Sequence, residues 1–331
     1  MPKRIVSLTL SIIVALGLAA CGGQVENGPQ AEQPVNITLY MGFQPDVQFA
    51  PFYVGVEEGF FAEQGLTVSF RHDAESTITR LVATDEIPFG IVSGEQVLLA
   101  RAQGAPLVYV YEWYQQFAVA VATKEGSGIV TVNDLAGRSV GVPMAEGASY
   151  IGLRALLAGG GLSESDIDLR VTGFAQVETL VTDQVDAVVV YLSNEPIQLD
   201  RAGVTTTVIP VTDYADLVAN GVITSERTIQ ENSELVQAFV NAFDAALAFT
   251  LENPDRAFEV SRSYVEGMSD PAIAEVQREV LERSLPLWSA PRLGETSPAS
   301  WIETQDVLLS MGLLDQPIEL EAAYTTDFLP E

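Results

Sequence analysis

The folded part of the chain begins with a strand-like alternation of apolar and polar residues. In VNITLYMGF, alternate apolar positions share one face. A helix of about 50–58 should follow, because Pro51 suits a first helical turn and Gly59 suits a C-terminal cap. A second strand is expected to start at Leu66. The order strand, helix, strand predicts a parallel sheet covered by helices.

The alternation of strands and helices continues into the middle of the chain. A helix is expected to end near Thr84, followed by a short strand at 89–92, a helix through Ala102 and a strand from Leu107. The apolar runs SVGVPM and DAVVVY are typical of buried strands, with a helical segment at 147–161 between them. These patterns predict an α/β protein with mostly parallel sheets.

The last third of the chain, from about Ser225, has the pattern of helices. In SELVQAFVNAFDAALAF, large apolar residues recur every four positions from Leu235 to Leu247, which places them on one inward-facing stripe. The chain has 331 residues with 47% hydrophobic content. At roughly 150 residues per domain, this length is enough for two lobes of ordinary size.

The N-terminus has the pattern of a secreted lipoprotein. Two basic residues precede an apolar run at 5–18 that is short for a membrane span, so we expect a signal peptide at 1–20. Small residues precede Cys21, the only cysteine, as in proteins whose thiol is acylated after cleavage. Residues 21–35 are expected to be a flexible tether. The sequence therefore predicts a lipoprotein. Acyl chains such as palmitate, attached at Cys21, would anchor it on the extracytoplasmic face of the cell membrane.

Composition excludes several classes of function. With Cys21 assigned to a lipid, a single histidine, His72, remains. This disfavours a zinc site or a catalytic triad, and we expect no metal, no cofactor and no catalytic residue. The net charge of −29 repels nucleic acid, so no nucleic-acid partner is expected. No aspartate-rich calcium loop is visible, and the acidic residues are interpreted as a solvated surface.

Several segments, taken in order, resemble the substrate-binding proteins of ABC importers. Within that group the chain is similar to the branch of thiamine-pyrimidine-precursor binders and hydroxymethylpyrimidine synthase. The segments are PFYVGVEEGFFAEQGLTV, VSGEQVLLARAQGAPLV, GSGIVTVNDLAGRSVGVP, YLSNEPIQL and NGVITSERTIQENSELVQAFVNAF, followed by ENPDRAF. They span nearly the whole chain after the tether.

The resemblance implies a two-lobed periplasmic-binding-protein fold of type II, with the ligand in the cleft between the lobes. The first lobe would comprise 36–123 plus 213–331, and the second would comprise 124–212. The resemblance also implies a monomer that closes on a small molecule. Its partners would be a membrane permease and the permease's cytoplasmic ATPase.

The aromatic-rich segment FQPDVQFAPFYVGVEEGFF supplies the first candidates for the site. In open parallel sheets, ligands bind beyond the carboxyl ends of the strands. Phe43, Gln44 and Asp46 follow the first strand and are therefore candidate ligand-binding residues. Phe52 and Phe60, at helical spacing, are expected to belong to the core.

Four further loops are expected to converge on the same cleft. Their candidate side chains are Ser93 and Glu95 in VSGEQ, Trp113 and Tyr114 in YEWYQQ, Glu146 and Tyr150 in PMAEGASY, and Tyr191, Asn194 and Glu195 in YLSNEP. For each aromatic residue, packing against the hinge or the opposite lobe is the alternative to ligand contact. The five loops contain no arginine, which argues against anionic ligands such as sulfonate or nitrate.

The candidate residues favour one class of ligand. Rings with nearby carboxylates and amides suit a planar heteroaromatic molecule with donor-rich edges. The resemblance points to vitamins and their precursors. The large rings, Trp113 among them, favour the tricyclic ring of riboflavin. The alternative is a thiamine pyrimidine precursor, either a formylated aminopyrimidine or hydroxymethylpyrimidine.

The rival function from another class is an enzyme like hydroxymethylpyrimidine synthase. By resemblance, that enzyme uses lysine-bound pyridoxal phosphate, histidine chemistry and a cysteine-rich motif. Only one lysine, Lys124, follows the signal peptide, and it lies in the strand expected at the hinge. Because a Schiff base needs an amine at the pocket, we expect no enzymatic activity.

Overall fold

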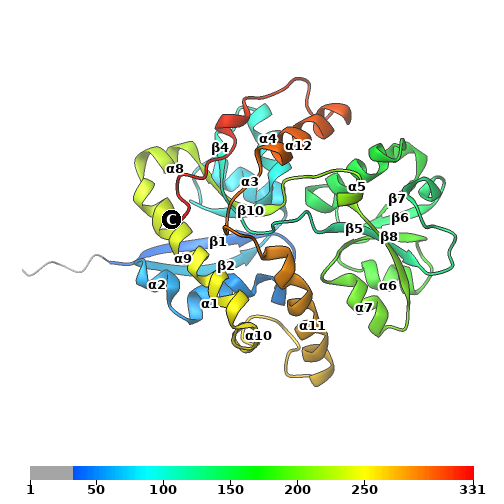
Figure 1. Cartoon of the computed structure of the whole chain (residues 1–331), viewed down its shortest axis with the longest axis horizontal. Helices are drawn as coiled ribbons and strands as arrows, with labels where there is room; N and C mark the ends of the chain where they lie inside the picture. Colours follow the sequence, from blue (N-terminus) through cyan, green and yellow to red (C-terminus); the bar gives the residue numbers. More distant parts are fainter. Residues whose placement is uncertain (1–32) are drawn as a thin grey trace, which may run out of the picture. The chain divides into compact units, whose positions relative to one another are not determined.

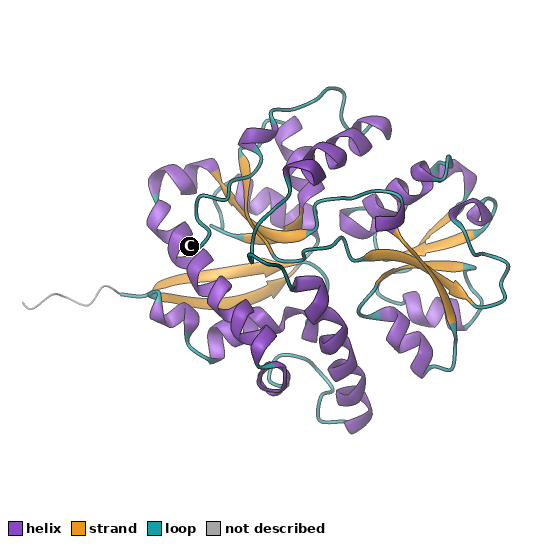
Figure 2. Cartoon of the chain, viewed as in Figure 1, coloured by secondary structure: helices purple, strands orange, loops and turns teal. Residues whose placement is uncertain are grey.

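The computed structural model describes residues 33–331, so the predicted signal peptide, Cys21 and most of the tether lie outside the described residues. Residues 34–331 form one compact unit. That unit contains two five-stranded sheets, each covered by helices (Figures 1 and 2). The predicted α/β class is confirmed.

The first sheet has the strand order β2-β1-β3-β10-β4. Its strands are β1 (Val35–Met41), β2 (Leu66–His72), β3 (Gly90–Ser93), β4 (Leu107–Glu112) and β10 (Asn220–Ser225). β1 pairs in parallel with β2 and β3, whereas β10 runs antiparallel to β3 and β4. The alternation predicted for β1 is present, since Ile37, Leu39 and Met41 are all buried.

The second sheet has the order β7-β6-β8-β5-β9. Its strands are β5 (Val119–Lys124), β6 (Ser139–Val142), β7 (Asp168–Val171), β8 (Ala187–Tyr191) and β9 (Thr206–Pro210). β5 runs antiparallel to β8 and β9, while β6 is parallel to β7 and β8. Both sheets are therefore mixed, each with one reversed strand. The boundary expected at 123/124 falls at the end of β5.

Helices cover both faces of the first sheet (Figure 1). One face carries α1 (Ala50–Glu57), α2 (Phe60–Glu63), α9 (Ser233–Glu252) and α10 (Pro254–Ser261), and the other carries α3 (Glu75–Ala83), α4 (Gly94–Ala102) and α12 (Pro298–Ser310). The remaining helices of this part are α8 (Glu226–Glu231) and α11 (Pro271–Trp288). Short 3-10 turns occur at η1 (Val47–Phe49), η2 (Val132–Leu135), η3 (Glu164–Asp166), η4 (Val211–Asp213) and η5 (Leu320–Ala322).

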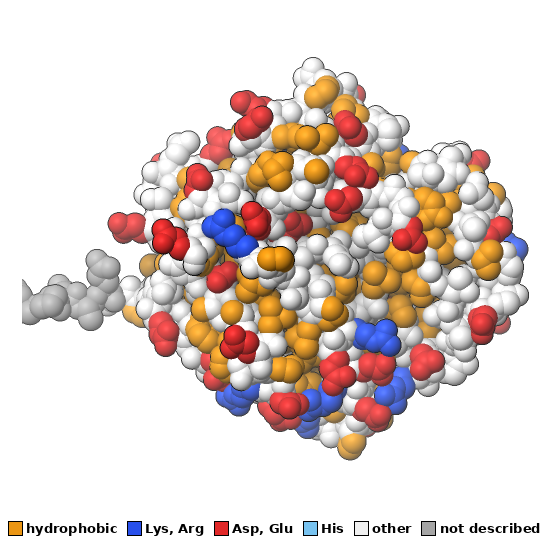
Figure 3. Space-filling model, viewed as in Figure 1, with side chains coloured by type: hydrophobic (Ala, Val, Ile, Leu, Met, Phe, Trp, Pro, Cys, Tyr) orange, Lys and Arg blue, Asp and Glu red, His pale blue; other side chains and the backbone are white. Residues whose placement is uncertain are grey.

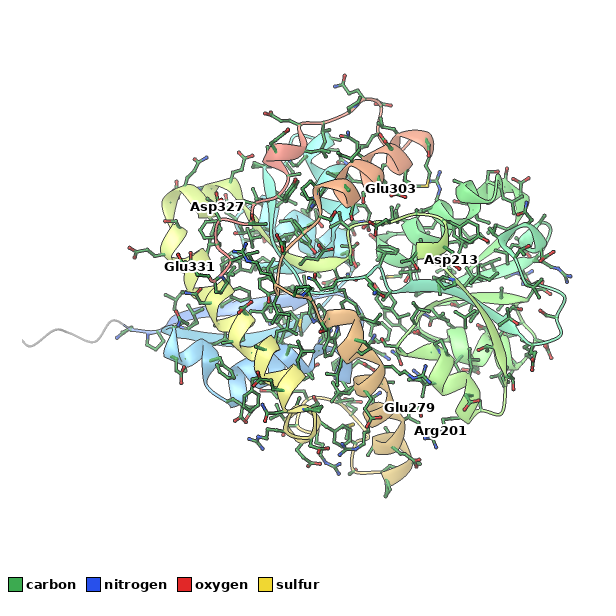
Figure 4. The ribbon with its side chains drawn as sticks, in the orientation of Figure 1. Arg201, Asp213, Glu279, Glu303, Asp327 and Glu331 are labelled. Atoms are coloured by element: carbon green, nitrogen blue, oxygen red, sulfur yellow. The ribbon has the colours of Figure 1, made fainter. Side chains whose placement is uncertain are left out.

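The second sheet is covered by α5 (Gly147–Gly159) on one face and by α6 (Gln176–Val181) and α7 (Glu195–Arg201) on the other. Arg201 of α7 reaches α11 of the first lobe, with ion pairs of 3.0 Å to Glu275 and 3.2 Å to Glu279 (Figure 4). Hereafter the first lobe means the first sheet with its helices, and the second lobe means the second sheet with α5, α6 and α7.

The core of the first lobe is built on α9. This helix is long and apolar enough to cross a membrane, but it packs against α1 and α2 as a core helix. Phe239, Phe243 and Leu247 of its predicted stripe are buried, and Phe52 stacks on Phe243 with centroids 4.2 Å apart. Burying each such side chain contributes roughly 1.5–3 kcal/mol. Phe52 is therefore a core residue, as expected.

Acidic side chains are spread over the visible face of the molecule (Figure 3). Basic side chains gather near α10 and α11, where Arg278 pairs with Asp255 at 2.6 Å. Because the acidic side chains do not gather in one patch on this face, they agree with the interpretation of a solvated acidic surface.

Candidate ligand-binding site

A cleft lies between the two lobes, beyond the carboxyl ends of several strands. It is lined by the segments that follow β1, β4, β6 and β8 and by the starts of α3, α5, α6 and α7. Its empty volume is ≈ 840 Å³, which includes the part open to solvent. This is the position that the fold gives to a bound ligand.

One wall of the cleft is a cluster of rings from the first lobe. Trp113 and Tyr114 follow β4, and their ring centroids lie 4.7 Å apart at 69°. Phe49 lies 5.6 Å from Trp113, and Phe52 meets that indole edge-to-face at 5.0 Å. Trp113 is 2% exposed. These contacts hold the wall in place without a ligand.

The opposite wall carries rings from the second lobe. Tyr191, at the end of β8, lies 6.2 Å from Tyr114 at 81°. Phe174, just before α6, meets Phe43 of the first lobe edge-to-face at 4.9 Å and is 45% exposed. Phe43 has a backbone φ of 62°, which is uncommon for a bulky residue and typical of ligand clamps.

A buried carboxyl group, Glu75, lies at the start of α3 and lines the cleft. Its Oε2 accepts hydrogen bonds from the Ser93 amide (3.2 Å) and hydroxyl (2.8 Å), and its Oε1 accepts one from Asn220 Nδ2 (3.3 Å). A Cβ placed on Gly147, at the start of α5, would lie 3.5 Å from Glu75 Cδ. That distance is an ordinary van der Waals contact, so the backbone φ of 72° at Gly147, and not a lack of space, is what favours glycine here.

Glu95 lies behind Glu75, and both groups contact the hydroxyl of Ser93. Burial, together with the charge of Glu75, raises the pKa of Glu95 to about 8. Burial also raises the pKa of Glu75. Because a protonated Glu95 can donate to Ser93 Oγ, that hydroxyl is then free to donate to Glu75. The three groups form one hydrogen-bonded chain that ends at the cleft.

Amide groups join the two lobes beside the cleft. Gln48 of the first lobe donates to Ser193 Oγ (3.0 Å) and to the Tyr114 hydroxyl (3.3 Å), and its Oε1 accepts from Asn194 Nδ2 (3.0 Å). The Tyr191 hydroxyl donates to Asn220 Oδ1 at 2.9 Å. These bonds orient the groups that a ligand meets.

Glu195, the first residue of α7, is 5% exposed and lines the cleft. One carboxylate oxygen accepts from the Tyr191 amide at 2.8 Å. Burial raises the pKa of Glu195 to about 7. Near neutral pH this group can therefore donate or accept a hydrogen bond toward the cleft.

The candidates chosen from sequence fall into two groups. The residues that line the cleft are Phe43, Trp113, Tyr114, Glu146, Tyr191, Asn194 and Glu195, and Gln44 lines an adjoining hollow. The others do not line either space. The Asp46 side chain caps η1 by accepting a hydrogen bond from the backbone N–H of Gln48 at 3.0 Å. The Tyr150 hydroxyl donates a hydrogen bond to the Glu164 carboxylate at 2.5 Å.

Ser93 and Glu95 also lie outside the lining. The Ser93 hydroxyl is turned to the buried carboxyl of Glu75, and the Glu95 carboxyl contacts Ser93 and the side-chain amide of Gln96. Sequence reasoning passed over Glu75 itself, together with Phe174, Gln176 and Asn220. Glu75 comes just after β2 and begins α3, so the rule that ligands bind beyond strand ends could have identified it. Phe174 also follows a strand, β7, but that strand is short and mostly exposed and has no apolar pattern that predicts it. Asn220 is the first residue of β10 and so precedes its strand.

Cationic side chains are absent from the linings of the cleft and of the adjoining hollow, within the described residues. Lys124 Nζ is paired with Asp183 Oδ1 at 2.6 Å and donates to the Val181 carbonyl at 3.0 Å. His72 Nδ1 lies 3.2 Å from the Gly42 carbonyl, and burial lowers the pKa of this histidine. Across 33–331, no group of three or more His, Cys, Asp or Glu residues could hold a metal ion.

The two sheets and the cleft between them define the periplasmic-binding-protein fold. The alkanesulfonate-binding protein SsuA of Xanthomonas axonopodis pv. citri superposes with a TM-score of 0.70 at 16% identity, covering 89% of this chain and 100% of that one. Identity this low shows the fold alone. The predicted two-lobed architecture is confirmed.

The chain belongs to the NMT1/THI5-like family, which matches residues 46–257. The riboflavin-binding protein RibY of Chloroflexus aurantiacus is 36% identical over 342 residues, covering 98% of this chain and 97% of RibY. A formylaminopyrimidine-binding protein of Halalkalibacterium halodurans is 27% identical over 332 residues, covering 98% of each chain. A 4-amino-5-hydroxymethyl-2-methylpyrimidine phosphate synthase of Legionella pneumophila is 21% identical over 301 residues, covering 89% of this chain and 92% of the synthase.

Proposed function

We propose that this protein captures riboflavin outside the cytoplasmic membrane and delivers it to the permease of an ABC importer. The observation that carries the proposal is the lining of the cleft: six aromatic residues, several carboxyl and amide groups, and no lysine or arginine among the described lining residues. Similarity to a riboflavin-binding protein over nearly the whole chain supports the same ligand.

The chemistry of the lining suits a neutral flavin. Its tricyclic ring offers a broad flat face for stacking, and each aromatic contact contributes about 0.5–1.5 kcal/mol beyond burial. The ring also has a polar edge with one N–H donor and carbonyl acceptors. Glu75 and Glu195 can accept from the donor, and side-chain amides can donate to the carbonyls. A strong anion would meet carboxylates without a compensating cation.

Transport follows from closure of the two lobes. A ligand that touches both walls binds the closed form better than the open form, and therefore shifts the population toward closed. The contacts of Gln48 with Ser193 and Asn194 already link the lobes beside the cleft. The closed protein then docks on the permease, and the ATPase drives release inward.

The location and the anchor are part of the same proposal. The signal peptide and the acylated Cys21 predicted from sequence would hold the protein on the outer side of the cell membrane. Mass spectrometry of the membrane fraction tests the anchor. A diacylated or triacylated N-terminal Cys21 supports it, and an intact Met1 contradicts it.

A thiamine pyrimidine precursor is the second candidate ligand. The similarity to a formylaminopyrimidine-binding protein favours it, and an aminopyrimidine could also pair with Glu75. The enzymatic alternative requires a lysine at the pocket. Lys124 does not line the cleft and is held by Asp183.

Quenching of riboflavin fluorescence tests the proposal on a soluble form that begins at Gly22. We expect saturation at one flavin per chain. Phe174→Ala should weaken binding, because this exposed ring lines the cleft. Ile302→Ala, which truncates an exposed apolar residue on α12 (53% exposed, against 45% for Phe174), is the matched control. Absence of quenching at micromolar protein would exclude riboflavin.

A further inference from the structure

A second hollow adjoins the cleft and is here called the side pocket. Its empty volume is ≈ 880 Å³, including open solvent. Phe43, Phe174, Gln176 and Glu195 line both spaces, so the side pocket continues the cleft. The phenyl rings of Phe43 and Phe174, which come from opposite lobes, mark the boundary between them.

The side pocket differs from the cleft in its chemistry. Its polar lining comes mainly from α6, α7 and the loop after β1, and includes Gln44, Gln176, Glu178, Thr182 and Gln198. Its only aromatic residues, within the described chain, are the two at the boundary. Amides and hydroxyls both donate and accept, so they match a flexible chain of hydroxyl groups better than a flat ring.

The side-chain amide of Gln176 offers a free donor and a free acceptor to a ligand. Gln176 is 4% exposed, and its side chain makes no hydrogen bond to another described residue. It lies at the junction of the two spaces. Its polar atoms are not among the buried, unpaired ones, so they face these spaces, where a ligand hydroxyl can pair with the amide.

We propose that the side pocket is a subsite for a neutral, hydroxyl-bearing chain attached to the ring that occupies the cleft. The inference rests on the proposed function, since riboflavin carries a ribityl chain on its ring. The carboxylate of Glu178, with no lysine or arginine among the described lining residues, selects against a phosphate at the end of that chain. The protein therefore discriminates flavins by their side chains.

Three flavins separate the subsite from the cleft. Lumiflavin has a methyl group in place of the ribityl chain, and flavin mononucleotide adds a phosphate to it. We expect riboflavin to bind most tightly and lumiflavin about tenfold or more weakly, because the lost hydroxyl contacts are each worth about two- to tenfold. Flavin mononucleotide should also bind at least about tenfold more weakly than riboflavin.

Variants of the side pocket test whether its residues cause the differences in affinity among the three flavins. Gln44→Ala should weaken riboflavin about two- to tenfold and leave lumiflavin within about twofold, because Gln44 lines the side pocket and not the cleft. Glu178→Lys should reduce the disadvantage of flavin mononucleotide, whereas Glu282→Lys, an equal change of charge on α11, should not. A selective loss of riboflavin is a result that a general structural defect cannot produce.

The outcomes distinguish this proposal from the proposed function. Equal binding of riboflavin and lumiflavin, or equal weakening of both by Gln44→Ala, overturns the subsite while the flavin function stands. If no flavin binds the unaltered protein, both the proposed flavin function and the proposed subsite are wrong.

Discussion

The two walls of the cleft are built differently. In the first lobe, Trp113 is 2% exposed and packed against the rings of Phe49 and Phe52. In the second lobe, Phe174 is 45% exposed and touches one ring, that of Phe43. The first wall is therefore preorganised by the core, while the second can adjust as the lobes close. This difference predicts that stability and affinity respond separately to substitutions on the two walls.

The largest expected effect comes from Trp113→Ala. Removing this buried side chain should lower the free energy of unfolding by about 3–5 kcal/mol, because it leaves a cavity in the first lobe. Urea denaturation measures the loss, and Trp113→Phe should recover part of it. An unchanged midpoint would show that this wall is not part of the core.

The next effect concerns the buried carboxyl of Glu95 behind the first wall. Its pKa in the folded state is raised to about 8 from about 4.5, so the folded protein holds this proton more tightly than the unfolded chain does. The resulting stabilisation is complete below about pH 4.5 and is lost as pH rises through about 8. Each pKa unit corresponds to about 1.4 kcal/mol.

Thermal unfolding at about pH 5.5 and 8.5 tests this sign. The unaltered protein should be less stable at the higher pH by at least about 1 kcal/mol, and Glu95→Gln should flatten that dependence. Glu195, whose pKa burial raises to about 7, contributes in the same direction. A variant with the same pH dependence as the unaltered protein would contradict the assignment.

On the second wall, Phe174→Ala should affect affinity and spare stability. Loss of one aromatic contact should weaken riboflavin by about 0.5–1.5 kcal/mol, while the free energy of unfolding changes by less than about 0.5 kcal/mol. Fluorescence titration and urea denaturation of the same preparation give both numbers. If Phe174→Ala lowered the free energy of unfolding as much as it lowered the affinity for riboflavin, the second wall would be part of the core, as the first wall is.

The smallest effect is expected at the rim, where Arg201 pairs with Glu275 and Glu279 across the lobes. Arg201 is 43% exposed, so solvent screens these pairs and Arg201→Ala should weaken closure only slightly. The loss of ligand affinity should disappear in high salt. Arg227→Ala, which breaks pairs within the first lobe, is the matched control.

Local patterns were enough to predict much of the fold. The predicted strand from Leu66 is β2, and the helix expected at 50–58 is α1 with η1 before it. The reversed strands β5 and β10 could not be predicted in the same way. Their direction depends on pairing with strands distant in sequence, where the chain crosses between the sheets.

The site was less accessible to sequence reasoning than the fold. The rule that ligands bind beyond strand ends placed Trp113 and Glu195 in the lining. The same rule could not tell which way a side chain turns, so Ser93 and Glu95 were chosen although Ser93 is turned to Glu75 and Glu95 to Ser93. Which of the lining residues touch the ligand stays a prediction.

The central claim, that the cleft is a riboflavin site, is tested most directly by calorimetric titration with riboflavin and with formylaminopyrimidine on the same protein. We predict one riboflavin per chain, with heat from the pyrimidine abolished once riboflavin is bound. Heat from the pyrimidine alone, with none from riboflavin, would contradict the claim and assign the cleft to the smaller heterocycle.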